Sequence, residues 1–247
     1  ERDGVAHHLF DVLDVTETAS VAAYQRAART VIEELRAAGR PPVLVGGSGL
    51  YVQAVVDELE FPGTDARLRA ELEAELAVVG PAALHTRRAA VDPAAAAAVL
   101  PGNGRRIVRA LEVVALTGRP FPARQAPGGP PRYDAVLLGV DRPTPELDER
   151  VARRVARMFA AGLVAATRSL LDRGLRDGRT ASRALGYQQV VAALDGPGDL
   201  AAAAVETVRA TRRFVRRQRS WFRRDRRIVW LGPGPDLLER ALRTLDP

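Results

Sequence analysis

A short apolar run, a glycine-rich turn and a helical pattern follow one another directly, and this succession limits the folds open to the chain. The run Val43–Val45 follows two prolines, the turn Gly46–Gly49 comes next, and Leu50–Leu59 has helical character. A short apolar run bounded by proline and glycine is typical of a buried strand. We therefore predict a strand at 43–45 that passes through a tight turn into a helix.

The same alternation recurs later in the chain. The apolar run Ala135–Val140 precedes a long helical pattern at 147–173, and Ile228–Leu231 is a last strand candidate. An earlier helix is expected at Val21–Ala38, with Ser20 as its N-cap. Strands separated by helices favour a parallel sheet, so the fold class is α/β.

The middle of the chain has a different pattern. Residues 61–132 are alanine-rich and almost wholly helical in character, without a strand candidate, and the Pro/Gly segment 120–131 closes them. We predict a helical insertion domain at 62–133, with the α/β core formed by residues 1–61 and 134–247.

A strongly basic helix is predicted near the C-terminal end, at 206–224. No acidic residue lies between Glu206 and Asp225. An exposed face usually mixes both signs of charge, so an all-arginine face favours phosphate binding. A charged surface helix in an arginine-rich protein is the alternative. The face carries Arg209, Arg212, Arg213, Arg216, Arg219 and Arg223.

Composition narrows the classes of function. The formal net charge is +7 and every one of the 37 basic residues is arginine, so attraction to polyanions is expected. The absence of cysteine excludes disulfides, zinc–thiolate sites and cysteine nucleophiles, and it suggests a reducing compartment. No apolar run approaches the roughly 18 residues of a membrane span. The three histidines lack ligand spacing, so no metal site is expected.

A second basic cluster stands at the start of a predicted helix. Arg105, Arg106 and Arg109 follow the loop Gly102–Gly104. Cations at a helix N-terminus oppose the helix dipole, so an external anion is the natural partner, with a solvated cluster as the alternative.

Five segments, in their order and spacing, resemble the tRNA dimethylallyltransferases, and together they span essentially the whole chain. They are His7–Asp11, Val43–Tyr51, Arg106–Gly118, Ala184–Tyr187 and Thr211–Phe222. The resemblance implies a P-loop-NTPase-like parallel sheet core, incomplete at the N-terminus, with a mostly helical insertion domain that grips a tRNA anticodon stem-loop.

The resemblance also implies an activity. Such enzymes transfer the dimethylallyl group of dimethylallyl diphosphate to N6 of the adenosine 3′ of the anticodon, with Mg²⁺ as cofactor. A monomer in the cytoplasm that acts on tRNA and contacts no membrane is expected. Because diphosphate is the leaving group, the site needs positively charged groups that contact the diphosphate. The target base must also leave its stack.

Residue by residue, the catalytic candidates are Ser48, Arg212 and Arg217. Ser48 stands where the family usually has threonine, and the two arginines match family positions for the diphosphate and active-site charge. Arg106 and Arg109 match insertion residues that hold the tRNA backbone. The whole expected tRNA-binding set is Arg69, Arg105, Arg106, Ile107, Val108, Arg109, Arg213 and Arg216.

One departure from the family pattern affects the expected activity. The family's Gly-x-x-x-x-Gly-Lys-[Ser/Thr] loop and the aspartate that follows it as general base have no match here. Two interpretations stay open: a sequence that starts about one βαβ unit late, or a lineage that lost catalysis. Under both, we expect this chain alone to be inactive.

Alternatives remain for the function and for single residues. An adenylate isopentenyltransferase is one, although the cluster at 105–109 argues against it, and a non-catalytic RNA-binding derivative is another. Tyr51 and Tyr187 could stack on bases or pack at the edge of the core. Asp141 follows a predicted strand, where α/β proteins bind ligands, but a turn that leads into a helix explains it equally well.

Overall fold

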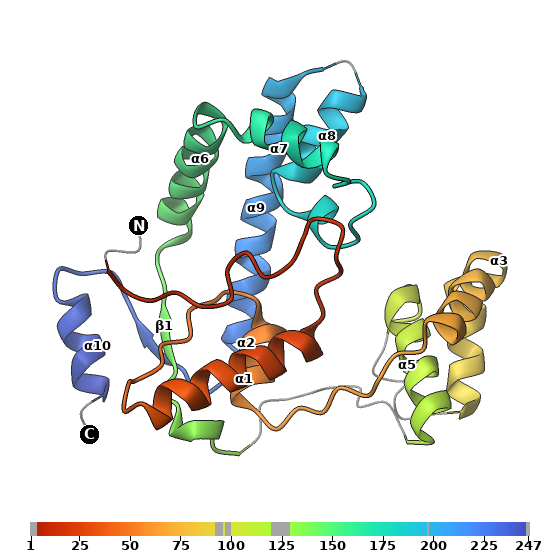
Figure 1. Cartoon of the computed structure of the whole chain (residues 1–247), viewed down its shortest axis with the longest axis horizontal. Coiled ribbons are helices and arrows are strands. Elements are labelled where there is room, and N and C mark those ends of the chain that lie inside the picture. Colours follow the sequence, from red (N-terminus) through yellow and green to blue (C-terminus); the bar gives the residue numbers. More distant parts are fainter. Residues whose placement is uncertain (1–3, 92–95, 97–99, 120–128, 197, 246–247) are drawn as a thin grey trace. The chain divides into compact units, whose positions relative to one another are not determined.

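The computed structural model describes residues 4–91, 96, 100–119, 129–196 and 198–245 (Figure 1). The chain divides into two compact units. We call residues 1–57 with 130–247 the core unit, and residues 58–129 the helical unit. The sequence-based boundaries of the insertion, 62 and 133, lie four residues later at each end. Part of the predicted closing segment, 120–128, lies outside the described residues.

A small parallel sheet lies in the core unit, between helices. Strand β1 (Leu138–Val140) pairs with β2 (Val229–Leu231), with Leu138 opposite Val229 and Val140 opposite Leu231 (Figure 1). Both strands fall within the segments predicted from sequence. The predicted mixed α/β fold with a parallel sheet is confirmed.

The strand predicted at 43–45 is wrong. Val43 and Val45 are 83% and 86% exposed, and only Leu44 packs against a core cluster. A strand requires a neighbour that takes up its backbone hydrogen bonds, and within the described ranges no segment forms a ladder with this one. The apolar run identified a segment next to the core but not its pairing.

Two helices flank this segment along the chain. Helix α1 (Val21–Ala37) begins where predicted, because the Ser20 hydroxyl accepts a hydrogen bond from the Ala23 amide at 3.1 Å. Helix α2 (Gly49–Val56) ends three residues before the predicted end. The two helices pack together through Ala28, Ile32, Val55 and Val56.

The predicted long helix at 147–173 is two helices. Helix α6 (Thr144–Ala160) and α7 (Leu163–Asp172) are separated at Gly162, whose φ of 96° is left-handed. That conformation ends a helix, and glycine adopts it without a steric penalty. The short 3₁₀ turns η1 and η2 occupy Arg132–Asp134 and Ala181–Arg183.

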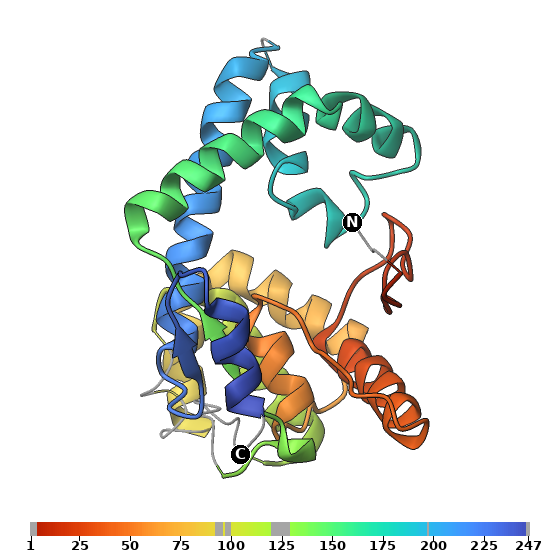
Figure 2. The ribbon, with the colours of Figure 1, turned by 90° about the vertical axis from the view of Figure 1, so that its left-hand side faces the viewer.

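Helix α9 (Leu200–Phe222) is the longest helix of the core unit and connects its parts. Asp199 caps it by accepting from the Ala202 amide. It packs against α8 (Tyr187–Asp195), α6 and α2, and Figure 2 shows it running from the α7–α8 region to the sheet. Helix α10 (Leu237–Leu245) follows β2.

The helical unit has a core of its own. Helix α3 (Ala66–Val91) bends at Gly80, which has a φ of 77° and is followed by Pro81, and it packs against α5 (Gly104–Thr117). The core comprises Leu72, Leu84, Ile107, Val108 and Leu111.

A buried ion triad fastens the end of α2 to the segment that follows α9. Arg227 bonds to Asp57 at 2.6 Å and to Asp225 at 2.7 Å, and its side chain is only 19% exposed. Hydrogen bonds that Arg227 donates to Asp225 and then to Asp57 raise the pKa of Arg227, and the bond from Arg227 lowers the pKa of Asp225. Arg29 donates to the Asp57 carbonyl at 2.7 Å from α1.

Asp57→Ala should therefore lower the free energy of unfolding of the core unit by about 3 kcal/mol, because it leaves part of a buried cation unpaired. Chemical denaturation followed by circular dichroism measures this. The control is Asp236→Ala, whose partner Arg240 is more exposed, and its effect should stay within about 0.5 kcal/mol. Equal effects of the two variants would contradict a structural role for the triad.

Candidate active site

The turn before α2 is held by α9. The Gln218 side-chain nitrogen donates to the Gly47 carbonyl oxygen at 2.7 Å. A Cβ placed on Gly49 would lie 2.1 Å from Trp221 Cδ1, so the indole lies directly against that glycine. The sequence placed Gln218 within a resembling segment but gave no sign of this contact.

Ser48 lies between these two glycines, at the N-cap position of α2. Its carbonyl accepts from the amides of Tyr51 and Val52 at 3.0 Å each. Its side chain makes no capping hydrogen bond, although serine is a preferred capping residue, and the residue is exposed. The hydroxyl is therefore available to another group.

Two aspartates pair with three arginines of α9 and with Arg223, the residue directly after its end. Asp148, on α6, pairs with Arg216 at 3.0 Å, and its carbonyl accepts from Arg212 at 3.0 Å. Asp141, directly after β1, accepts from Arg219 and Arg223 at 3.0 and 2.9 Å. The absence of acids within the helix sequence therefore did not mean an absence of acids beside it.

The charge of Asp141 is stabilised by this pairing. Burial alone would raise the pKa of Asp141, but the hydrogen bonds from Arg219 and Arg223 outweigh it, and the pKa is lowered. Arg219 also donates to the Thr144 hydroxyl at 2.6 Å, at the start of α6. Asp141 also accepts a hydrogen bond from the Arg142 amide at 2.9 Å, within the turn that leads into α6, so its ion pairs join α9 to that turn.

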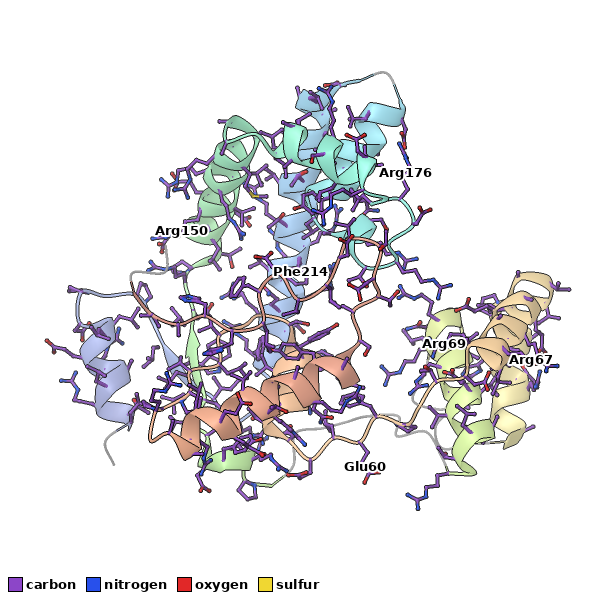
Figure 3. The ribbon with its side chains drawn as sticks, viewed as in Figure 1. Glu60, Arg67, Arg69, Arg150, Arg176 and Phe214 are labelled. Carbon is purple, nitrogen blue, oxygen red and sulfur yellow. The ribbon has the colours of Figure 1, made fainter. Side chains whose placement is uncertain are left out.

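Arg217 differs from the arginines around it. Arg213 pairs with Glu206 at 2.7 Å, and Arg209 lies 3.7 Å from the same carboxylate. The Arg217 guanidinium instead lies over the Phe214 ring, 5.7 Å from its centroid, and the residue is exposed. Within the described part of the chain it has no carboxylate partner. Figure 3 labels Phe214, on α9.

In the helical unit, two of the predicted tRNA-binding arginines contact a buried acid. Arg109 pairs with Glu112 at 2.7 Å and donates to the Pro62 carbonyl at 2.6 Å, and Arg69, labelled in Figure 3, bonds to the same carboxylate. The Glu112 side chain is 0% exposed. Burial would raise the pKa of Glu112, but hydrogen bonds from Arg69 and Arg109 lower it below its ordinary value.

The other residues of that cluster divide by exposure. Ile107 and Val108 are 0% and 3% exposed and form part of the helical unit's core. Arg105 and Arg106 are exposed in the first turn of α5, where the Asn103 side chain accepts from the Arg106 amide at 3.2 Å. The cluster at 105–109 therefore combines an outward pair of cations with residues that hold the helix in place.

Among the residues with described positions, no three His, Asp or Glu side chains gather closely enough to hold a metal ion. In the same part of the chain, no helix has the length and apolar character needed to cross a membrane.

The sequence matches a known family over most of its length. The family described as IPP transferase matches residues 1–225. A tRNA dimethylallyltransferase of Salinispora tropica is 63% identical over 248 residues, which cover 100% of this chain and 77% of the relative. One of Streptomyces griseus is 63% identical over 250 residues, covering 100% and 80%. These names favour the tRNA-modifying interpretation over both alternatives.

Solved structures of tRNA-modifying enzymes resemble this chain as well. The full-length tRNA isopentenylpyrophosphate transferase of Bacillus halodurans is 37% identical, with a TM-score of 0.67 over 99% of this chain and 80% of that one. A eukaryotic dimethylallyltransferase acting on tRNA has a TM-score of 0.80 over 98% of this chain and 65% of that one. At 20% identity it supports the fold alone.

Proposed function

Because this chain belongs to the IPP transferase family, we propose that it transfers a dimethylallyl group from dimethylallyl diphosphate to N6 of the adenosine 3′ of a tRNA anticodon. One observation carries the assignment to particular residues. The segment of α9 that bears the exposed Arg217 also contacts, through Gln218, the turn that presents the Ser48 hydroxyl. One helix thus positions a cation and a hydroxyl, two of the groups that this reaction uses.

The reaction forms a bond between N6 and C1 of the dimethylallyl group and breaks the bond between C1 and the diphosphate oxygen. The N6 proton passes to a general base, a role that the family gives to an aspartate without a match in this chain, and diphosphate leaves with the bonding electrons. Arg217 neutralises the charge that develops on the diphosphate, and the Ser48 hydroxyl accepts a hydrogen bond from the amine and orients it. Arg212, held by Asp148, supplies further positive charge beside the site.

Mg²⁺ belongs to the proposal only through the family. The described residues form no cluster that fits the ion, so no step is assigned to it. Magnesium sites often consist of substrate phosphates and water with one or two carboxylates. A cytoplasmic location and a monomeric state are likewise proposed from the family.

RNA binding is proposed for the predicted set, in two roles. The exposed Arg105 and Arg106 contact the stem-loop backbone, with Arg213 and Arg216 as further contacts on α9. Arg69 and Arg109, which share Glu112, and the buried Ile107 and Val108 hold α5 in the position from which those contacts are made.

The test is dimethylallyl transfer from labelled donor to an anticodon stem-loop that carries adenosine 3′ of the anticodon. This chain is assayed beside a protein extended upstream through its native coding sequence, and stem-loop binding is measured in the same samples. Transfer by the extended protein is expected. Binding without transfer by either protein would favour a non-catalytic RNA-binding derivative, and neither binding nor transfer would contradict the whole proposal.

Arg106→Ala should weaken stem-loop binding roughly tenfold, because it removes a charge-assisted contact to phosphate. The loss should be similar for stem-loops of different sequence, since phosphate contacts do not read bases. Fluorescence anisotropy measures the affinity. Arg67→Ala is the control, because that side chain is 91% exposed on α3 of the same unit and pairs with Glu71. Equal losses for both variants would contradict a specific contact.

A further inference from the structure

Helix α9 approaches the turn before α2 at two glycines. A Cβ on Gly47 would lie 2.1 Å from the Gln218 side-chain nitrogen, and one on Gly49 would lie 2.1 Å from the Trp221 ring. Neither glycine has a left-handed φ. The flexible Gln218 side chain could shift away from a methyl group on Gly47, whereas the Trp221 ring could not do so for one on Gly49. The close approach of α9, and not the backbone conformation, therefore requires glycine at Gly49.

These two contacts differ from ordinary core packing. Trp221 is 41% exposed, and neither it nor Gln218 belongs to a buried hydrophobic cluster. The Gln218 amide satisfies one backbone carbonyl, at Gly47, one residue before Ser48. The indole lies against Gly49, one residue after it. The backbone on both sides of Ser48 is thus fixed from α9, while the Ser48 hydroxyl makes no cap.

We propose that Gln218 and Trp221 are positioning residues for the prenyl transfer, which act by fixing the Gly47–Gly49 turn and hence the Ser48 hydroxyl. The inference rests on the proposed function. Gln218 follows Arg217 directly in α9, so a displacement of the turn relative to α9 changes the separation of hydroxyl and guanidinium. Misplacement of about 1 Å can cost a hundredfold in rate.

The chain offers a matched control for Gln218. The Gln25 side-chain nitrogen donates to the Ala54 carbonyl, also at 2.7 Å, but this bond joins α1 to α2 within the core and does not involve the turn. Gln218→Met and Gln25→Met each delete one such donor at nearly constant side-chain size. In the extended, active protein, Gln218→Met should lower kcat at least tenfold with stem-loop affinity unchanged. Gln25→Met should lower the denaturation midpoint and leave kcat unchanged.

A second pair of variants tests Trp221. Gly49→Ala should lower kcat because the new methyl group meets the indole. Trp221→Leu alone should also lower kcat with stem-loop affinity unchanged, because it removes the ring that fixes the turn. Since both substitutions act on one contact, their combined loss should be smaller than the sum of the two separate losses. The proposal is overturned if the parent protein transfers dimethylallyl groups and either Gln218→Met or Trp221→Leu retains the parent kcat. A parent without any transfer would instead contradict the proposed function itself.

Discussion

Replacing Arg217 with alanine in the extended protein should lower kcat about a hundredfold while changing stem-loop affinity little. Positioned cations act most strongly where charge develops in the transition state, and removing one such group typically costs two to three orders of magnitude. Within the described ranges, Arg217 has no carboxylate partner, so its charge is available to the leaving diphosphate. Single-turnover transfer and anisotropy measure the two quantities separately.

Arg209→Ala is the matched control, because Arg209 is 69% exposed on the same helix and lies near Glu206. It should leave kcat within about twofold of the parent value. The comparison with Arg106→Ala tests whether Arg217 serves mainly the transfer step and Arg106 mainly the binding of the stem-loop. Equal losses of affinity from Arg217→Ala and Arg106→Ala would contradict it.

Glu112→Gln should lower the free energy of unfolding of the helical unit by about 3 kcal/mol. The substitution keeps the side-chain size but leaves the charges of Arg69 and Arg109 without their carboxylate. Chemical denaturation followed by hydrogen exchange in α3 and α5 measures the change. Glu71→Gln is the control, because Glu71 is 59% exposed and its ion pair is on the surface. A loss below 1 kcal/mol would contradict the structural role of Glu112.

The stabilisation that Glu112 provides should also depend on pH. The folded-state pKa of Glu112 is lowered from the ordinary 4.5 by its two arginines, so the unfolded state binds a proton more readily. The stabilisation is therefore fully present above pH 4.5 and is lost as pH falls through the lowered folded pKa. The difference in stability between the parent and Glu112→Gln should shrink over that acidic range. A difference that stays constant would show that the carboxylate charge is not its source.

Local signals predicted the helices of this fold better than its strands. Ser20 gave the start of α1 correctly, and the arginine pattern located most of α9. Gly162 was hidden within a long helical pattern, because a helix tolerates an interior glycine and only its left-handed φ ends this one. The apolar run 43–45 was not a strand because pairing depends on a neighbour, which periodicity does not reveal.

The residue types of the candidate site could be predicted from the sequence, but the ion-pair partners of its arginines could not. The family resemblance singled out Arg212 and Arg217, but the sequence of α9 did not tell which of its arginines have a carboxylate partner. The acids that distinguish them, Asp141 and Asp148, lie more than sixty positions earlier in the chain. Glu112 stands three residues after Arg109, a spacing that allows a pair, but its burial follows from the packing of α5 on α3.

The pairing on α9 also bears on how binding should respond to ionic strength. Carboxylates at Asp141, Asp148 and Glu206 already act as counterions for the guanidinium groups beside them. When an RNA phosphate binds an arginine that is already paired with a carboxylate, the net number of condensed cations released from the RNA is small. On duplexes each fully neutralised phosphate contributes about 0.9 to the slope of log K against log ionic strength. That slope should therefore fall well below the number of arginines on the helix, and it counts only the cations that the fold has left without an internal counterion.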